Sequence, residues 1–378
     1  MMVSVIIVSF NTSSLLRRCL AELIDHSTDV EMEVFVVDNN SSDDSVAMVE
    51  SEFPQVTLIA NEVNLGFAGA NNQAWKESTG DFVLLLNPDA FVRQGAVYNA
   101  VKFMEAHPEC GVCGGRLVKP DGTLDPSARK FPTFLSKFLM LTGLRNKFPR
   151  SRIFAGHEFG NFDHNRVMEV DWVPGTFTMY RRKMLDQTGL FDERFYIYYE
   201  ETDLCQSAKR HGWKVYFLPR SEIIHVGGAS SKTRKEHTFD DAALQVTKFR
   251  MRSEWLYFRK NGGLGSVLAN AGVELGWHLL RWVVNHTPGK TDHQLKKKAS
   301  AKIMGEIAHV TGKAQTLVAG HATQNGALDL IRLDVVHQIC LSSFTISHNP
   351  WYVKILPLRC MMRPLKPFRS TNQSTSGP

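Results

Sequence analysis

Apolar and polar positions alternate in blocks along the first third of this sequence. Four apolar runs predict buried strands, at residues 3–10, 34–37, 56–60 and 82–86. The segments between them predict helices, which begin near residues 13, 43 and 68; apolar positions recur there at helical spacing, as at Leu16, Leu20 and Leu23. Strands that alternate with helices predict βαβ units and an α/β fold with a mostly parallel central sheet.

The pattern becomes less regular further along the chain. Residues 116–168 are rich in Pro, Gly, Arg and Phe and predict a loop system with short helices around 133–142. A helix over 200–211 and a strand over 214–218 follow, and residues 239–260 predict a basic helix. The stretch 264–284 is mostly apolar but is interrupted by Glu274, His278 and Arg281.

Charge divides the sequence into two parts. Residues 1–231 carry a net charge of −6, whereas residues 232–378 carry +12, within a total of +6. We therefore expect a catalytic body at 1–231, a basic, mainly helical extension at 232–363 and a disordered tail at 364–378.

Composition favours a globular protein in a reducing compartment. Hydrophobic residues make up 43% of the 378 residues, and the six cysteines show no disulfide framework. Cys110 and Cys113 form an isolated CxxC, which we interpret as a turn with small buried thiols, with zinc or redox chemistry as the less favoured alternative. The first residues predict a buried strand in place of a signal peptide, and no apolar stretch is long enough for a membrane span.

Candidate chemistry lies where predicted strands end. Asn87-Pro88-Asp89 follows the apolar run 82–86, and ligands of open α/β sheets bind outside the carboxyl ends of the strands. A carboxylate there suits Mg²⁺ or Mn²⁺, although Asn-Pro and Pro-Asp are also common turn pairs. Asp38 ends the second strand and predicts either a contact to a base or ribose, or a helix cap.

Two further segments carry a functional and a structural interpretation. Asn64-Leu65-Gly66 opens a helix rich in small residues, where backbone amides can approach an anionic group. Glu200, Glu201 and Asp203 place three carboxylates within four positions and can raise one another's pKa, as a general base requires. The same residues also suit an ordinary acidic helix start.

Taken in order, these segments resemble glycosyltransferase family 2, the inverting GT-A enzymes, and within it the bacterial rhamnosyltransferase-like branch of surface polysaccharide synthesis. The matching segments are V-S-F-N, V-V-D-N-N-S-S-D, N-x-G-F-A-G-A-N-N, L-L-N-P-D, G-x-F-D-E-x-F, Y-x-E-E-x-D-L and H-x-x-G-x-S-S, spread over about residues 3–260. The resemblance implies a GT-A fold and an enzyme that moves a sugar from a nucleotide-sugar to a glycan or polyprenyl-linked glycan.

The resemblance also implies roles for individual residues. Ser9 and Asn11 would line the nucleotide pocket, Asp38 would hold the base or ribose, and Asn64 and Gly66 would lie along the nucleotide and diphosphate. Asp89 would ligate Mg²⁺ or Mn²⁺, with Asn87 in place of the family's first aspartate, and His225 could complete the metal site.

On the acceptor side, the resemblance places the base at Glu201, with Glu200 as its neighbouring alternative, while Asp203 caps or braces the helix. Trp172 and Gly175 would shape the acceptor side, although Trp172 equally suits plain core. The proposed mechanism is a single in-line displacement that inverts the anomeric centre.

The basic extension predicts a partner. Its apolar stretches, Trp277, Trp282 and Lys296–Lys298 suit a helix in an anionic membrane interface. The resemblance implies lipid-linked acceptors on the cytoplasmic membrane face, so we expect a cytoplasmic protein held peripherally on the inner membrane face. A helical cap on the body or a dimer contact are the alternatives, and nothing predicts nucleic-acid binding.

Two other functional classes compete with the glycosyltransferase. One is a non-catalytic GT-A-like scaffold that binds a nucleotide or glycan, against which the acidic pair and Asp89 argue. The other is a nucleotidyltransferase, whose usual Gly-rich, basic N-terminal loop does not follow Val8. Rhamnose is the sugar that the resemblance suggests, whereas the acceptor and the linkage are open.

Overall fold

The computed structural model describes residues 1–148, 150–154, 156–159, 162–227, 241–285, 293 and 296–307. They belong to one compact unit, Met1–Val310, and the second unit, Thr311–Pro378, lies outside the described residues, as does the tail predicted to be disordered.

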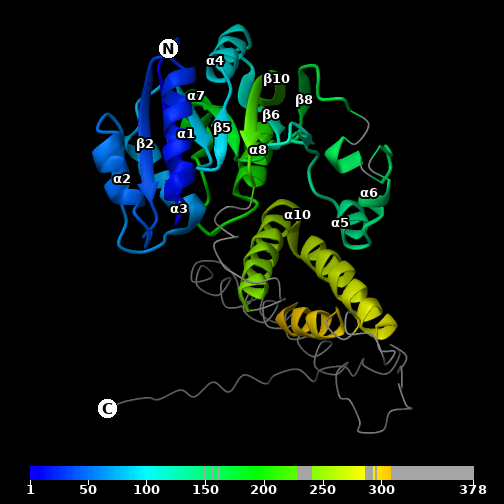
Figure 1. Cartoon of the computed structure of the whole chain (residues 1–378). Coiled ribbons are helices and arrows are strands. Elements are labelled where there is room, and N and C mark those ends of the chain that lie inside the picture. Colours follow the sequence, from blue (N-terminus) through cyan, green and yellow to red (C-terminus); the bar gives the residue numbers. More distant parts are fainter. Residues whose placement is uncertain are drawn as a thin grey trace, which may run out of the picture. The chain divides into compact units, whose positions relative to one another are not determined.

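The first third folds as βαβ units, as the hydrophobic pattern predicts (Figure 1). Its elements are β1 Val3–Ser9, α1 Ser13–His26, β2 Met32–Asp38, α2 Ser45–Glu52, β3 Thr57–Ala60, α3 Gly66–Glu77 and β4 Phe82–Leu86. Each predicted strand is therefore present, within a few residues of its expected bounds.

The remaining body contains several elements that the sequence pattern missed. Its elements are β5 Ala90–Val92, α4 Ala96–Ala106, β6 Cys110–Val118, β7 Leu124–Asp125, α5 Phe134–Leu141, α6 Leu144–Lys147, η1 Gly156–Glu158, β8 Met168–Val170, β9 Phe177–Arg181, α7 Arg182–Thr188, α8 Glu200–Arg210 and β10 Lys214–His225. Those that were not expected include β5, β6, β7, β9 and α7.

The sheet is mixed, with long parallel ladders and an antiparallel strand at its centre. The strand order is β3-β2-β1-β4-β9-β6-β10-β5, and β7 and β8 pair with β6 and β10. β1 pairs in parallel with β2 and β4, and β6 pairs in parallel with β10, whereas β9 runs antiparallel to both β4 and β6.

Apolar side chains cover both faces of the sheet and give three layers. On one face, Leu16, Leu20 and Met104 from α1 and α4 pack against β1 and β4. On the other face, Ala74, Leu185 and Leu204 from α3, α7 and α8 complete a second cluster. This burial on both sides explains why the central strands are continuous apolar runs.

The CxxC segment was interpreted wrongly as a turn. Cys110 and Cys113 lie in β6, and both thiols are buried, as expected. Burial raises the pKa of the Cys113 thiol well above its ordinary value, which disfavours the thiolate that metal binding or redox chemistry needs.

Helix α10, Asp241–Val284, adds two helical arms to the body. Gly263 interrupts it with φ 74° and ψ −172°, a conformation that is open to glycine and strained for other residues. Residues 296–307 form a further helical segment, and Met251, Trp255, Val267 and Ile303 share a small apolar cluster with Phe195 of the body.

A buried polar network joins α5 to both arms of α10. The Lys137 ammonium lies 2.8 Å from a Glu254 oxygen, 2.6 Å from a Glu274 oxygen and 2.5 Å from the Asn270 side-chain oxygen. The Lys137 side chain is 3% exposed, and Arg250 adds a second cation beside the two glutamates. Although burial raises the pKa of Glu274, the Lys137 and Arg250 cations outweigh it and hold that pKa below its ordinary value.

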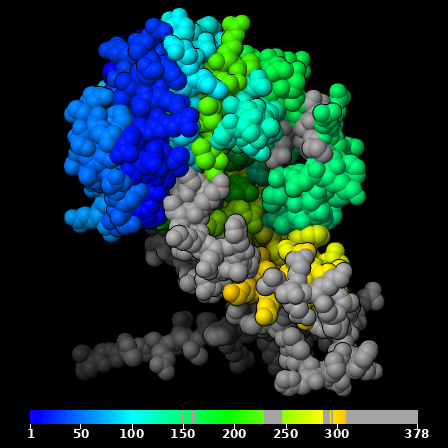
Figure 2. All heavy atoms as spheres, in the orientation of Figure 1, coloured from blue at the N-terminus to red at the C-terminus, as the bar shows by residue number. Residues whose placement is uncertain are grey.

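Because of this network, α5 and the second arm of α10 bury polar side chains and expose apolar ones. This inverts the usual pattern of an amphipathic helix. Asn270, Glu274 and His278 are buried, whereas Leu279 and Leu280 on the same arm are 47% and 55% exposed. In α5, Lys137 is buried while Leu135 and Phe138 are 59% and 46% exposed. Residues of α5 and α6 form the right flank of the body in Figure 2, away from the N-terminal residues in blue.

Among the described residues, membrane-spanning helices are absent, because none combines the necessary length and hydropathy. The apolar stretch 264–284 forms the second arm of α10, and part of its apolar surface is exposed.

Replacing Lys137 with Met should destabilise the protein by about 3–5 kcal/mol, because two buried carboxylates lose their principal cation. Chemical unfolding of the full chain measures this change. Lys102→Met is the matched control: the Lys102–Glu105 ion pair has the same 2.8 Å separation but lies at the surface, where solvent screens it, so its loss should have little effect on stability. Equal costs for the two variants would contradict this account of the network.

Candidate functional site

The carboxyl ends of β1, β2 and β4 meet at one edge of the sheet. Ser9 is paired with Asp38 across the β1–β2 ladder, and Asn61 donates its backbone amide to the Asp38 carbonyl. The topology thus brings together Ser9, Asn11 and Asp38, as the sequence predicts, and loops from these strands build a common surface.

Asp38 provides an acceptor that protein groups use only in part. One carboxylate oxygen accepts the backbone N–H of Ser41 at 2.9 Å. The other oxygen is buried and has no hydrogen-bond partner among the described residues, an arrangement that costs free energy unless a ligand or water occupies it. Asp38 therefore fits the predicted contact to a ribose or base.

Ser9 and Asn11 shape the adjoining loop. The buried hydroxyls of Ser9 and Thr12 lie 3.0 Å apart. Asn11 has a left-handed backbone, φ 53°, and its side-chain oxygen accepts the Ser42 amide at 2.7 Å. These bonds tie the loop after β1 to the loop after β2.

Asn39 organises the same edge and was not singled out from the sequence. Its side chain is buried, donates to the Gly66 carbonyl at 3.0 Å and accepts the Leu65 amide at 3.1 Å. Asn39 thereby fixes the start of α3 next to Asp38. Its position directly after the strand-end aspartate is the signal that could have identified it.

Asn64 and Gly66 contact the segment that precedes the acidic helix. The Asn64 side-chain oxygen accepts the Tyr196 hydroxyl at 2.9 Å, and Phe67 donates its amide to the Tyr196 carbonyl at 2.8 Å. Gly66 has φ 76°, and a Cβ there would lie 2.5 Å from the Tyr196 carbonyl oxygen, so only glycine fits. The structure therefore brings the predicted nucleotide segment beside the predicted base segment.

Asn87-Pro88-Asp89 turns directly from β4 into β5. Asn87 donates its amide to the Thr176 carbonyl at 3.0 Å, which connects this turn to the segment around Gly175. β5 then pairs with β10 in a register that sets Ala90 opposite His225, and Val226 donates its amide to the Asp89 carbonyl.

This register places Asp89 and His225 together, as the metal interpretation requires. A buried Asp89 oxygen lies 3.7 Å from His225 Nε2, and His225 Nδ1 lies 3.2 Å from an Asp125 oxygen. The described residues hold no complete cluster of three ligating side chains. A carboxylate and an imidazole nonetheless fit a divalent cation that takes its other ligands from substrate phosphates and water.

Glu200 and Glu201 begin α8 under a strained turn. Tyr198 and Tyr199 both have left-handed backbones, with φ 72° and 70°, and such strain often marks functional segments. Glu200 is buried, whereas Glu201 is partly exposed and accepts the Gly175 backbone N–H. One oxygen of each carboxylate lacks a hydrogen-bond partner among the described residues.

Burial raises the pKa of both carboxyls. The pKa of Glu200 lies well above its ordinary value because of burial and then the Glu201 charge, and burial also raises the pKa of Glu201. Such a pair shares its protons, so that one member stays protonated while the other ionises. Each carboxyl has one buried oxygen, but the Glu201 residue as a whole is the more exposed of the two, which makes it the first candidate to accept a proton from a substrate.

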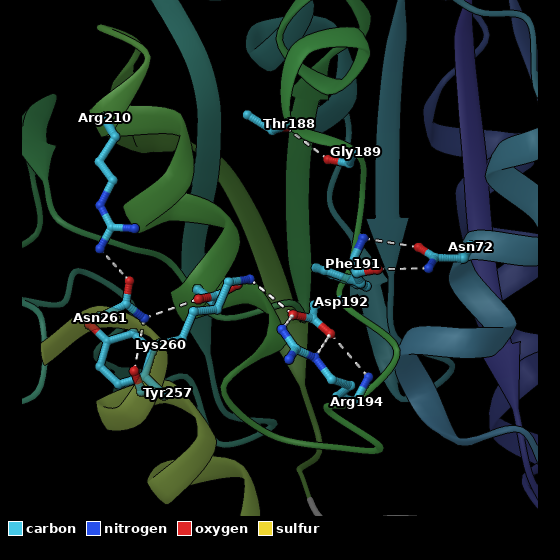
Figure 3. A network of polar contacts seen from close by, with 11 residues as sticks. Asn72, Thr188, Gly189, Phe191, Asp192, Arg194, Arg210, Tyr257, Lys260 and Asn261 are labelled. Atoms are coloured by element: carbon cyan, nitrogen blue, oxygen red, sulfur yellow. Dashed lines mark hydrogen bonds and ion pairs between the residues drawn. The ribbon is translucent and has the colours of Figure 1, made fainter. Parts of the chain in front are cut away.

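The first arm of α10 braces this acidic segment. Ser253 donates its hydroxyl to the Ile197 carbonyl at 2.8 Å, and Lys260 bonds Asp203 at 2.6 Å and Asp192 at 3.0 Å. Figure 3 shows Lys260 and Arg194 converging on Asp192, with Asn261 between Tyr257 and Arg210. Asp203 thus connects α8 to α10 and braces the helix, as predicted.

Trp172 holds a neighbouring loop, whereas Gly175 contacts the acidic pair Glu200 and Glu201. The Trp172 indole N–H donates to the Lys130 carbonyl at 2.9 Å and fixes the loop before α5. Gly175 contacts Glu201 directly through its amide, which agrees with a place beside the acceptor.

The raised pKa of Glu200 predicts a pH-dependent stability. The folded protein retains the Glu200 proton to a higher pH than the unfolded chain does, so stability falls as pH rises from the ordinary glutamate pKa toward the folded one. The side chain of Glu200→Gln cannot ionise, so this variant lacks the loss of stability with rising pH. The difference in Tm between the variant and the unaltered protein should therefore grow in favour of the variant by a few degrees between pH 5 and pH 8. Thermal unfolding measures the gain; the exposed Glu50→Gln is the control, and a pH-independent difference would contradict the prediction.

Comparisons with known proteins identify relatives of this chain. The family model described as Glycosyl transferase family 2 matches residues 4–189. An N-acetylglucosaminyl-diphospho-decaprenol L-rhamnosyltransferase of Mycobacterium tuberculosis is 27% identical over 232 residues, which cover 58% of this chain and 75% of the relative. The rhamnosyltransferase WbbL of Escherichia coli is 26% identical over 238 residues, 59% of this chain and 83% of the relative.

Among solved structures, the chain is similar to the mannosyltransferase PcManGT of Pyrobaculum calidifontis in complex with GDP-Man and Mn²⁺. That structure shares 17% sequence identity and a TM-score of 0.47, with 90% of this chain and 85% of that chain covered.

Proposed function

We propose that this chain, which belongs to glycosyltransferase family 2, is a metal-dependent inverting enzyme that transfers a sugar from a nucleotide-sugar to a glycan hydroxyl in surface polysaccharide synthesis. One observation carries the proposal. The raised-pKa pair Glu200–Glu201 reaches the Asn87-Pro88-Asp89 turn through Gly175 and Thr176. The proposed general base and the carboxylate proposed to hold the cation therefore belong to one connected site.

Glu201 is the proposed base. It is partly exposed, and the Gly175 amide orients its carboxylate, whereas Glu200 is buried and retains its proton more strongly. Glu201 removes the proton of the acceptor hydroxyl while that oxygen attacks the anomeric carbon. Attack from the face opposite the nucleotide diphosphate breaks the sugar–phosphate bond and inverts the configuration.

The donor would lie along the strand ends. The unpartnered Asp38 oxygen would accept a hydrogen bond from the ribose or base, and the start of α3, which Asn39 fixes beside Asp38, would lie along the nucleotide and diphosphate. Asp89 and His225 would hold Mg²⁺ or Mn²⁺, which when bound stabilises negative charge on the departing diphosphate.

The relatives suggest the substrates. Two of them are rhamnosyltransferases, and the mycobacterial protein is named for an N-acetylglucosaminyl-diphospho-decaprenol acceptor. We propose a rhamnosyl donor and a polyprenyl-linked glycan acceptor for this chain. We further propose that residues 1–231 form the catalytic body and that the extension 232–363 serves the acceptor side, with α10 as its structural link.

Replacing Glu201 with Gln should lower kcat by about 10²–10⁴-fold and leave donor binding unchanged, because the amide cannot accept the proton. Nucleoside diphosphate release is measured across a panel of nucleotide-sugars with Mg²⁺ or Mn²⁺ and lipid-linked acceptor extract. The exposed Glu31→Gln is the control. Near-normal turnover of Glu201→Gln would remove Glu201 from the mechanism, and donor binding without turnover by the unaltered protein would favour the scaffold.

The exposed apolar residues of α10 support the proposed contact with a membrane. Leu279, Leu280, Val283 and Val284 recur at i, i+1, i+4 and i+5, so they share one face of α10, and each is at least 47% exposed. Cations lie near this face: Arg281 falls between its members in the sequence, and the Lys297 ammonium sits 5.2 Å from the Trp282 ring centroid. An apolar face with cations and tryptophan suits an anionic membrane interface.

Leu280→Glu combined with Val284→Glu should reduce binding to vesicles that contain anionic phospholipid, because each change places a charge in the apolar interface. Vesicle flotation of the full chain measures the bound fraction. Val63→Glu, at a side chain that is 61% exposed elsewhere on the body, is the control. The point changes test this apolar face alone. Deletion of residues 264–378 would also remove Asn270 and Glu274, which contact Lys137 in the buried network. Equal flotation of both variants would argue against this face.

A further inference from the structure

His225 lies between two carboxylates that come from different strands. Its Nε2 atom is 3.7 Å from an Asp89 oxygen, and its Nδ1 atom is 3.2 Å from an Asp125 oxygen. Asp89 follows β4, His225 ends β10, and Asp125 ends β7. The sequence pattern did not single out Asp125, because residues 116–168 were interpreted as an irregular loop system.

The two ring nitrogens of a neutral histidine have opposite roles. One carries the proton and donates, whereas the other holds a lone pair that can bind a metal ion. A carboxylate beside Nδ1 accepts a proton from that nitrogen and stabilises the tautomer with its lone pair on Nε2. Carboxylates in this position orient metal-ligating histidines in many metalloproteins.

We propose that Asp125 is a positioning residue: it holds His225 in the Nδ1–H tautomer and directs the Nε2 lone pair toward a divalent cation beside Asp89. The inference rests on the proposed metal site and adds the residue that fixes the tautomer and the orientation of its histidine.

The β6–β7 hairpin fixes Asp125 for this task. Asp125 pairs with Leu117, and Leu124 pairs with Val118, so the short strand β7 is bound to the end of β6. β6 in turn pairs with β10 up to Ile224, the residue before His225. Backbone ladders therefore set the separation of Asp125 and His225.

The same hairpin offers a matched control. Asp121 is exposed at its turn, where its carboxylate accepts the amide and the hydroxyl of Thr123 at 2.9 and 2.6 Å. Asp121→Asn removes the same charge as Asp125→Asn from the same hairpin. It leaves the contact between Asp125 and His225 in place.

The first measurement is Mn²⁺ binding by the full chain, followed by electron paramagnetic resonance with MnCl₂ and without donor or acceptor. Asp125→Asn should weaken Mn²⁺ binding by about 10–100-fold, Asp121→Asn should leave it unchanged, and Asp89→Ala should abolish it. Loss of binding in Asp89→Ala with unaltered binding in Asp125→Asn would overturn the inference and leave the metal site standing. Unaltered binding in both variants would overturn the metal site itself.

The second measurement reads the tautomer in metal-free protein by long-range ¹H–¹⁵N NMR of labelled histidines. The unaltered chain should show His225 protonated at Nδ1, and Asp125→Asn should shift the population toward Nε2–H, because an amide can donate to Nδ1. An Nε2-protonated His225 in the unaltered chain would overturn the inference whatever the Mn²⁺ result. His225 is assigned by the signal missing from His225→Gln.

Discussion

The candidate site of this chain depends on one buried cation. Lys137 binds two glutamates and an asparagine from the two arms of α10. The first arm also holds the acidic segment through Ser253 and Lys260. Since a buried charge is tolerated only where its partners are fixed, the ion network sets where α10 can lie, and α10 sets where the strained turn before Glu200 can lie.

Hydrophobic pattern was sufficient for the N-terminal half of the fold and insufficient for the centre of the sheet. The strands β1 to β4 are continuous apolar runs bounded by turn residues, which is a strong local signal. β6 contains Gly111, Gly114 and Gly115, and a Cβ at Gly114 would lie 2.6 Å from Val173, so its small residues reflect close packing that no local pattern reveals. β9 is only five residues long and pairs antiparallel, which βαβ logic does not anticipate.

The candidate site shows the same division between local and tertiary information. Asp38, Asp89 and Glu201 were predicted because each carboxylate follows a recognisable strand or opens a helix. Asn39, Tyr196 and Asp125 were missed because their importance comes from partners 27, 132 and 100 positions away in the chain. Sequence motifs thus identified the candidate groups for substrate contact, whereas the groups that hold those motifs in place could be identified only from the fold.

The bracing of the acidic segment also has a consequence for the order of events during synthesis. The sheet and the strand-end loops are complete once residue 225 has left the ribosome, but Ser253, Tyr257, Lys260 and Asn261 emerge only afterwards. The strand-end loops can therefore form on the nascent chain while the turn at Tyr198 and Tyr199 still lacks its support. That support comes late, with the segment that also carries the exposed apolar face, so that the proposed base and the proposed contact with the membrane are completed in the same stage of synthesis.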